Sequence, residues 1–225
     1  MQIVDHPSPN FGERRNDAKP ELIVIHYTAM ATTQLAADRL CDPATEVSAH
    51  YLIAEDGKIL RLIAEDCRAW HAGAGEWGGK CDINSRSIGI ELANDGFSPF
   101  ANRQIDALES LLAAVMARWR IPMQGVIAHS DMAPQRKTDP GPRFDWRRLA
   151  LSGLAVWPDH SGASETDFMS AARCFGYPDG PTEDVLWAFR LRFRPWATGP
   201  LDATDRAMIA DLAARYPVDP APASA

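Results

Sequence analysis

The sequence has no long hydrophobic run. No stretch approaches the ~20 consecutive apolar residues that a membrane-spanning helix requires, which excludes a helical membrane span. The first 20 residues also lack the apolar core and the small-residue cleavage site of a secretory signal peptide. The sequence therefore predicts a cytoplasmic protein, or a periplasmic or exported one if a leader was trimmed from the N-terminus.

The chain also lacks a cysteine framework and an excess of positive charge. Its four cysteines form no CxxC pair, so we expect free thiols in a reducing compartment. There are 23 Lys and Arg residues against 30 Asp and Glu, a net charge of −7, which argues against a nucleic-acid binder. The 225 residues, 46% of them hydrophobic, are sufficient for one good core and a small second one.

Strand and helix patterns alternate along the first part of the chain. This alternation predicts an α/β fold, with a central mixed β-sheet flanked by helices. Asp56-Gly57 between two apolar runs is a strong hairpin signal. The predicted elements are a strand at 21–28, a helix at 32–40 with Thr32 as its N-cap, a hairpin within 48–66, a strand at 87–94, a helix at 102–120 and a strand at 125–129.

The amino-acid composition of the sequence changes after Trp146. We expect a first domain over residues 1–152, a Gly-, Pro- and Ser-containing linker over 153–164 and a small three-helix domain over 165–225. A core this small gives only marginal stability by itself, so the second domain is expected to pack against the first. Its helices are predicted at about 165–175, 183–193 and 203–216, with Asp202 capping the third, and its core residues as Leu186, Phe189, Leu191, Phe193, Ile209 and Leu212.

Two of the six histidines end predicted strands. Ligands gather at the carboxyl ends of strands in open α/β sheets, so His26 and His129 can meet there although 102 residues separate them. With Asp139 they make a zinc-type donor set that leaves a fourth position for water. The alternative is that each histidine is an ordinary hydrogen-bonded core residue. His6 and His160 lie in loop-like sequence and are expected to be plain surface residues.

Glu91 lies between Ile90 and Leu92 in an apolar strand. A carboxylate there is costly to bury unless it is paired or protonated. Alternation places Glu91 on one face with Gly89 and Ala93, which leaves room for a substrate. The position favours a general acid or base whose pKa burial raises toward neutrality. An edge-strand glutamate in water is the alternative.

Lys137 precedes Asp139 by two residues, so an extended backbone puts both side chains on the same side. A cation there could stabilise the oxyanion of a tetrahedral intermediate. A solvated loop lysine is the alternative, because the surrounding segment is charged. The prolines and glycine that follow are expected to fix the loop that carries Asp139.

Five ordered motifs resemble the zinc-dependent N-acetylmuramoyl-L-alanine amidases of the Amidase_2 type. They are "VIHYTA", "SAHYLI", "AWHAG", "SIGIELAN" and "VIAHSDMAPQRKTDPGP". The resemblance covers roughly residues 15–150 and implies a fold similar to that of phage-type amidases and peptidoglycan recognition proteins. A weaker resemblance relates residues 165–218 to a small helical peptidoglycan-binding domain.

The resemblance implies Zn²⁺ held by His26, His129 and Asp139, Glu91 as the acid/base residue and Lys137 as the charge stabiliser. It places His50 and His71 in motifs that line the substrate groove, and it makes Asn84 a weaker candidate for substrate contact. Phage-type relatives carry a tyrosine where this chain has Ala49, so no tyrosine role is transferred.

The function implied is hydrolysis of the amide bond between N-acetylmuramic acid and L-alanine in peptidoglycan or (anhydro)muropeptides, by a monomer. Two alternatives are a peptidoglycan receptor that has lost catalysis and a zinc peptidase acting within the stem peptide. A cytoplasmic location would favour soluble fragments as substrates, whereas the C-terminal segment suggests contact with the polymeric wall.

Overall fold

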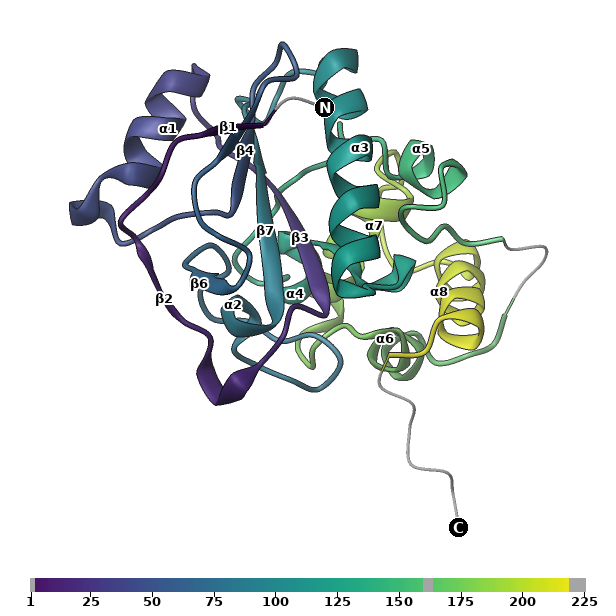
Figure 1. Cartoon of the computed structure of the whole chain (residues 1–225). Helices are drawn as coiled ribbons and strands as arrows, with labels where there is room; N and C mark the ends of the chain where they lie inside the picture. The colour runs from purple at the N-terminus through teal and green to yellow at the C-terminus, as the bar shows by residue number, and fades with distance from the viewer. Residues whose placement is uncertain (1–2, 160–163, 219–225) are drawn as a thin grey trace.

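The computed structural model describes residues 3–159 and 164–218 (Figure 1). Its centre is a six-stranded sheet in the order β1-β5-β4-β7-β3-β8. The strands are β1 (Ile3–Asp5), β3 (Leu22–Tyr27), β4 (Tyr51–Ile53), β5 (Ile59–Arg61), β7 (Ser87–Leu92) and β8 (Val126–Ala128). Only the β4–β5 pair is antiparallel among these neighbours, so the predicted mixed sheet is confirmed. A separate antiparallel pair joins β2 (Phe11–Glu13) and β6 (Cys67–Ala69).

The elements of the first part of the chain form for the local reasons that the sequence predicts. Thr32 caps α1 (Thr33–Cys41) by accepting a hydrogen bond from the Leu35 amide. The Asp-Gly turn joins β4 and β5 as a hairpin, and the long amphipathic segment becomes α3 (Asn102–Trp119). The four cysteines are free thiols in the described structure.

The two faces of β3 are covered by different parts of the chain. Ile23 and Ile25 point to the face covered by α3, where they join one hydrophobic cluster. Leu22 and Val24 point to the other face and join a cluster built largely from the C-terminal helices. Since side chains alternate along a strand, His26 projects from this second face, beyond the end of that cluster.

The strand predicted at 125–129 is one residue too long at each end. β8 ends at Ala128, and His129 begins the short helix α4 (His129–Met132) instead of ending the strand. The side chain of Asp131 accepts a hydrogen bond of 2.9 Å from the Ala128 amide, which satisfies a free donor at the start of the helix. His129 is therefore held at a strand-to-helix junction.

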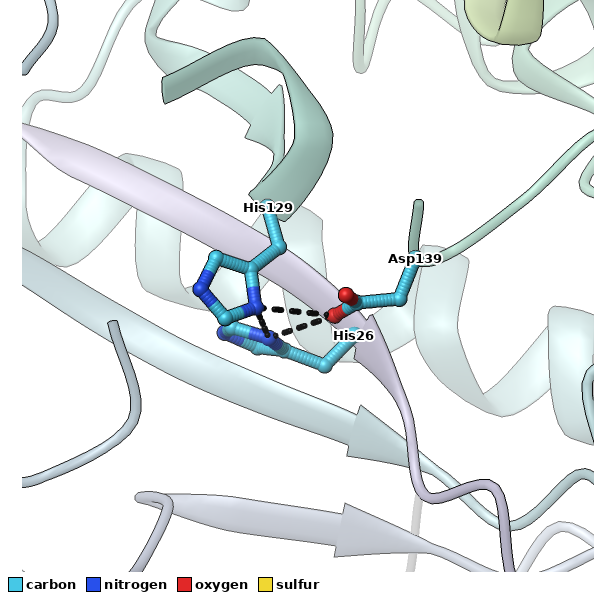
Figure 2. Close-up of side chains that lie close together, drawn as sticks. All are labelled: His26, His129 and Asp139. Carbon is cyan, nitrogen blue, oxygen red and sulfur yellow. Dashed lines mark hydrogen bonds and ion pairs between the residues drawn. The ribbon is translucent and has the colours of Figure 1, made fainter. Parts of the chain in front are cut away.

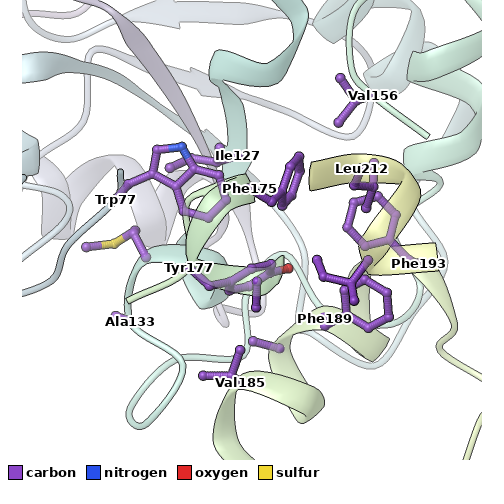
Figure 3. Close-up of a cluster of buried hydrophobic side chains, with 14 of the residues drawn as sticks. Trp77, Ile127, Ala133, Val156, Phe175, Tyr177, Val185, Phe189, Phe193 and Leu212 are labelled. Carbon is purple, nitrogen blue, oxygen red and sulfur yellow. The ribbon is translucent and has the colours of Figure 1, made fainter. Parts of the chain in front are cut away.

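Three helices follow in the C-terminal part, as predicted, and Asp202 caps the last of them. All six predicted core residues are buried. All of them except Leu191 belong to a cluster that also contains Leu22, Val24 and Ile127 of the sheet, so these helices share their core with the sheet. Figure 3 shows part of this cluster, with Ile127 beside aromatic residues of the C-terminal part. The helices are α6 (Phe168–Phe175), α7 (Thr182–Phe193) and α8 (Ala203–Arg215). The other α-helices of the described residues not yet named are α2 (Ile83–Arg86) and α5 (Trp146–Leu151).

The segment expected to link two domains is partly packed. Leu154, Ala155 and Val156 are buried, and they belong to the same clusters as the sheet and the C-terminal helices. Residues 160–163 of that segment lie outside the described residues. The division into two domains stays a prediction.

A buried ion pair also joins α7 to α4. Arg192 donates to Asp131 Oδ2 at 2.6 Å and to the Val126 carbonyl at 3.0 Å, and both charged side chains are fully buried. Tyr177 donates to the other oxygen of Asp131 at 2.8 Å. These contacts tie the C-terminal helices to the helix that begins at His129.

None of the helices within residues 3–159 and 164–218 has both the length and the apolarity of a membrane-spanning segment.

Candidate metal centre and active-site cavity

Three side chains from distant parts of the chain converge at one end of the sheet (Figure 2). His26 comes from the end of β3, His129 from the first residue of α4 and Asp139 from the loop that follows. His26 Nδ1 lies 2.9 Å from both His129 Nδ1 and Asp139 Oδ2, and His129 Nδ1 lies 3.0 Å from the same carboxylate oxygen. A backbone hydrogen bond from Ser130 to the Asp139 carbonyl fixes the loop against α4.

This donor set fits a divalent ion. The three residues are buried, at 1%, 3% and 7% exposure, and each offers one ligand atom within 4.8 Å of the others. Zinc is bound by imidazole nitrogen and carboxylate oxygen at ~2.0–2.2 Å, so three such atoms can share one ion. In this arrangement two imidazole nitrogens and one carboxylate oxygen face the same point. A cation shared by the three atoms would stabilise it.

The protonation states of the cluster also suit a metal. Burial, together with the neighbouring His129, lowers the pKa of His26 to about 4. Burial by itself would raise the pKa of Asp139, but hydrogen bonds with His129 and His26 outweigh it and hold that pKa below its usual range. His26 is thus neutral and Asp139 ionised at neutral pH, the forms that bind metal ions.

Glu91 lies beside this cluster because of strand register. It pairs with His26 across the parallel β3–β7 ladder, and paired residues project from the same face. Burial, reinforced by the charge of Asp139, raises the pKa of Glu91 to about 8, while Lys137 opposes the shift. Its Oε2 atom is buried and has no hydrogen-bond partner within the described structure. A carboxyl group with a free oxygen and a near-neutral pKa can exchange a proton with a substrate.

The cluster opens into a cavity of about 350 Å³. Glu91 and Lys137 line it with the three clustered residues, so all five residues predicted to do chemistry are brought together. Arg39, from α1, and Arg136 add positive charge to the wall. The cavity therefore combines a candidate metal site, a proton-transfer group and cations suited to an anionic or polar substrate.

The residues predicted to contact substrate are placed differently from one another. His71 lines the cavity, but its ring is hydrogen-bonded to His26 and Ser87. His50 is fully buried outside the cavity wall, and its Nδ1 accepts from the Gly89 amide at 2.9 Å. Asn84 is also buried outside the wall, with its side-chain oxygen on backbone amides.

Sequence reasoning missed two arginines near the site. Arg14 donates to the carbonyls of Glu65 and Ser85 and contacts His50, so it links an N-terminal loop to the segments around His50. Arg136 lines the cavity and donates to the Ala72 and Ala74 carbonyls. Both lie in charged, loop-like sequence, where nothing separates a structural arginine from a solvated one.

Known proteins share this architecture. The chain is 37% identical over 235 residues to the N-acetylmuramoyl-L-alanine amidase AmiD of Escherichia coli K12, covering 88% of this chain and 84% of that protein. It is 33% identical over 160 residues to the 1,6-anhydro-N-acetylmuramyl-L-alanine amidase AmpD of Enterobacter cloacae, covering 64% of this chain and 86% of that protein.

Two solved structures are similar over nearly the whole chain. The complex of E. coli AmiD with the substrate anhydro-N-acetylmuramic acid-L-Ala-D-γ-Glu-L-Lys superposes with a TM-score of 0.81 at 34% identity, covering 92% of this chain and 94% of that one. AmpDh3 from Pseudomonas aeruginosa with anhydromuramic pentapeptide gives a TM-score of 0.79 at 31% identity, covering 93% and 95%. The family model described as N-acetylmuramoyl-L-alanine amidase, Amidase_2, matches residues 16–142, which contain all five converging residues. The chain therefore belongs to the N-acetylmuramoyl-L-alanine amidase family.

Proposed function

We propose that this chain is a zinc-dependent amidase that hydrolyses the bond between the lactyl group of N-acetylmuramic acid and L-alanine, in anhydro-muropeptides or peptidoglycan. The observation that carries the proposal is the convergence of His26, His129 and Asp139 beside Glu91, inside a cavity, in a chain of this family. Relatives crystallised with anhydromuropeptides support the substrate class.

Different residues of this chain have different roles in amide hydrolysis. Zinc, held by His26, His129 and Asp139, would supply Lewis acidity and lower the pKa of a water molecule. Glu91 accepts the proton that the attacking water releases as its oxygen bonds to the amide carbon. The Lys137 ammonium stabilises the negative charge that develops on the carbonyl oxygen. Glu91 then donates the proton to the departing nitrogen of L-alanine as the C–N bond breaks, which leaves a free carboxyl and a free amine.

Product analysis tests the reaction and its alternatives together. A defined anhydro-muropeptide incubated with the zinc-loaded protein is expected to give an anhydro-muramyl sugar and an intact stem peptide, as measured by mass spectrometry. Cleavage inside the stem peptide would instead identify a peptidase, and stable binding without cleavage would identify a receptor. Parallel incubation with intact sacculi separates a role in recycling soluble fragments from a role in degrading the wall. The cytoplasmic location and the monomeric state stay predictions.

Zinc is expected to stabilise the folded protein. One equivalent should bind per chain, and free zinc at 100 times its dissociation constant should raise the free energy of unfolding by about 2.7 kcal/mol, because the ion binds only the folded state. Thermal unfolding with and without EDTA measures the effect. His129→Ala removes one ligand and should abolish the zinc-dependent increase. An equal increase in that variant would place the metal elsewhere.

A further inference from the structure

Each histidine of the metal cluster uses its second ring nitrogen in a hydrogen bond away from the cluster. His26 Nε2 lies 3.0 Å from His71 Nδ1. His129 Nε2 lies 2.9 Å from the carbonyl oxygen of Ala72, the next residue after His71. The same two-residue segment, His71 and Ala72, therefore contacts both candidate ligands at Nε2, on the side away from the cluster.

Hydrogen-bond chemistry assigns the proton on every nitrogen of the His26 chain. The Ser87 hydroxyl donates to the Ile83 carbonyl at 2.6 Å, and this uses its only proton. Ser87 Oγ also lies 3.0 Å from His71 Nε2, so that nitrogen must carry the proton and donate it. His71 Nδ1 is then the acceptor for His26 Nε2–H. This leaves the lone pair of His26 on Nδ1, the atom that faces His129 and Asp139.

His129 is fixed by a simpler contact. A carbonyl oxygen only accepts, so His129 Nε2 carries the proton that it donates to Ala72, and its lone pair is on Nδ1. Both imidazoles thus present Nδ1 to the same point. The tautomer is set in each case by a partner that cannot bond to the alternative form.

Asn84 fixes the backbone of His71 and Ala72, the two residues that hydrogen-bond to the candidate ligands. Its Oδ1 accepts from the backbone amide of His71 at 3.1 Å and from that of Ala72 at 2.8 Å. The strand beneath makes room for the His71 ring at Gly89, where an added Cβ would lie 2.4 Å from the ring's Cγ. Hydrogen bonds and packing contacts of this kind, which orient the ligands without touching the ion, are typical of the outer shell of a metal site.

We propose that His71, Ser87 and Asn84 are positioning residues that fix both histidine ligands in the Nδ1-binding form, rather than residues that bind substrate. This inference rests on the metal site of the proposed function. A rival role for His71 is direct contact with the substrate, since its ring also borders the cavity. The two roles differ in what they do to metal affinity.

Zinc affinity of the metal-free protein separates the roles. Competition with a chromogenic chelator should show His71→Phe, which keeps a ring but removes both hydrogen bonds, binding zinc about 10–100-fold more weakly than wild type. His71→Asn retains an acceptor near the Nδ1 position and should recover much of that loss. Arg39→Gln, on the α1 wall of the same cavity, is the control and should bind zinc like wild type. Unchanged zinc affinity in His71→Phe, with a raised KM on a muropeptide, would overturn the proposal.

A second measurement needs no variant. In zinc-loaded wild-type protein with ¹⁵N-labelled histidine, long-range proton–nitrogen spectra should show His26, His71 and His129 each carrying a proton on Nε2. A proton on Nδ1 of His71 would overturn the proposal even if the variants fail to fold. Neither measurement depends on turnover, so a protein that cleaves no amide bond but behaves as described would refute the proposed function and leave this inference standing.

Discussion

Replacing Glu91 by glutamine is expected to lower kcat by about 10²–10⁴-fold, the usual contribution of a positioned proton-transfer group. Glutamine has nearly the same shape but cannot accept a proton from water and return it to the leaving amine. The carboxyl group of Glu91 projects beside His26 without being part of the donor cluster, so zinc should remain bound at one equivalent. Steady-state kinetics on an anhydro-muropeptide, with zinc content measured on the same sample, provide the test.

Glu55→Gln is a suitable control for this change. Glu55 is an exposed carboxylate in the β4–β5 hairpin, where it accepts a hydrogen bond from Thr33, and it does not line the cavity. Its neutralisation should leave kcat unaltered. If Glu91→Gln turned over substrate at the wild-type rate with zinc in place, the proton-transfer role would have to be assigned to another group.

Replacing Arg192 by methionine is expected to lower the free energy of unfolding by about 3–5 kcal/mol, because it leaves the carboxylate of Asp131 buried without its counter-charge. The Arg192 guanidinium also lies 4.3 Å from the centre of the Trp146 ring, a further contact that methionine replaces only in part. Tyr177 and the Ala128 amide would still bond to Asp131, but neither is charged. Chemical denaturation gives the free energy.

The exposed pair of Arg61 and Asp5 provides the comparison. Both side chains are at least half exposed, so Arg61→Met should cost less than about 1 kcal/mol. Adding Asp131→Asn to Arg192→Met should restore part of the stability by removing the stranded charge. A loss in Arg192→Met no larger than that in Arg61→Met would mean that the buried pair contributes little to the fold.

The strands and long helices could be predicted because their signals are local. Alternation and three-to-four spacing mark β3, β7 and α3, and a single hydroxyl or turn dipeptide marks α1 and the hairpin. Convergence of His26, His129 and Asp139 also followed from the rule for strand ends and from the ordered motifs. The step from strand to helix at His129 was missed because it depends on one side-chain hydrogen bond from Asp131.

The contacts that hold the site in place could not be predicted in the same way. Asp131 and Arg192 are 61 residues apart, and nothing in either local sequence indicates a buried pair. The hydrogen bonds of His71 and Asn84 depend on the path of a loop rather than on a repeating pattern. A motif identifies a residue as part of a site, but whether it touches the substrate or another side chain is decided by three-dimensional packing.

The shared core between the sheet and the last three helices has a consequence for protein engineering. A truncation before α6 would expose Leu22, Val24 and Ile127. It would also leave Asp131 without Arg192 in an apolar surface, two residues from the candidate metal ligand His129. A foreign module therefore cannot replace the last three helices by cutting the chain between α5 and α6 and fusing the module there. A new targeting module has to be appended beyond α8, with the native helices retained as part of the catalytic scaffold.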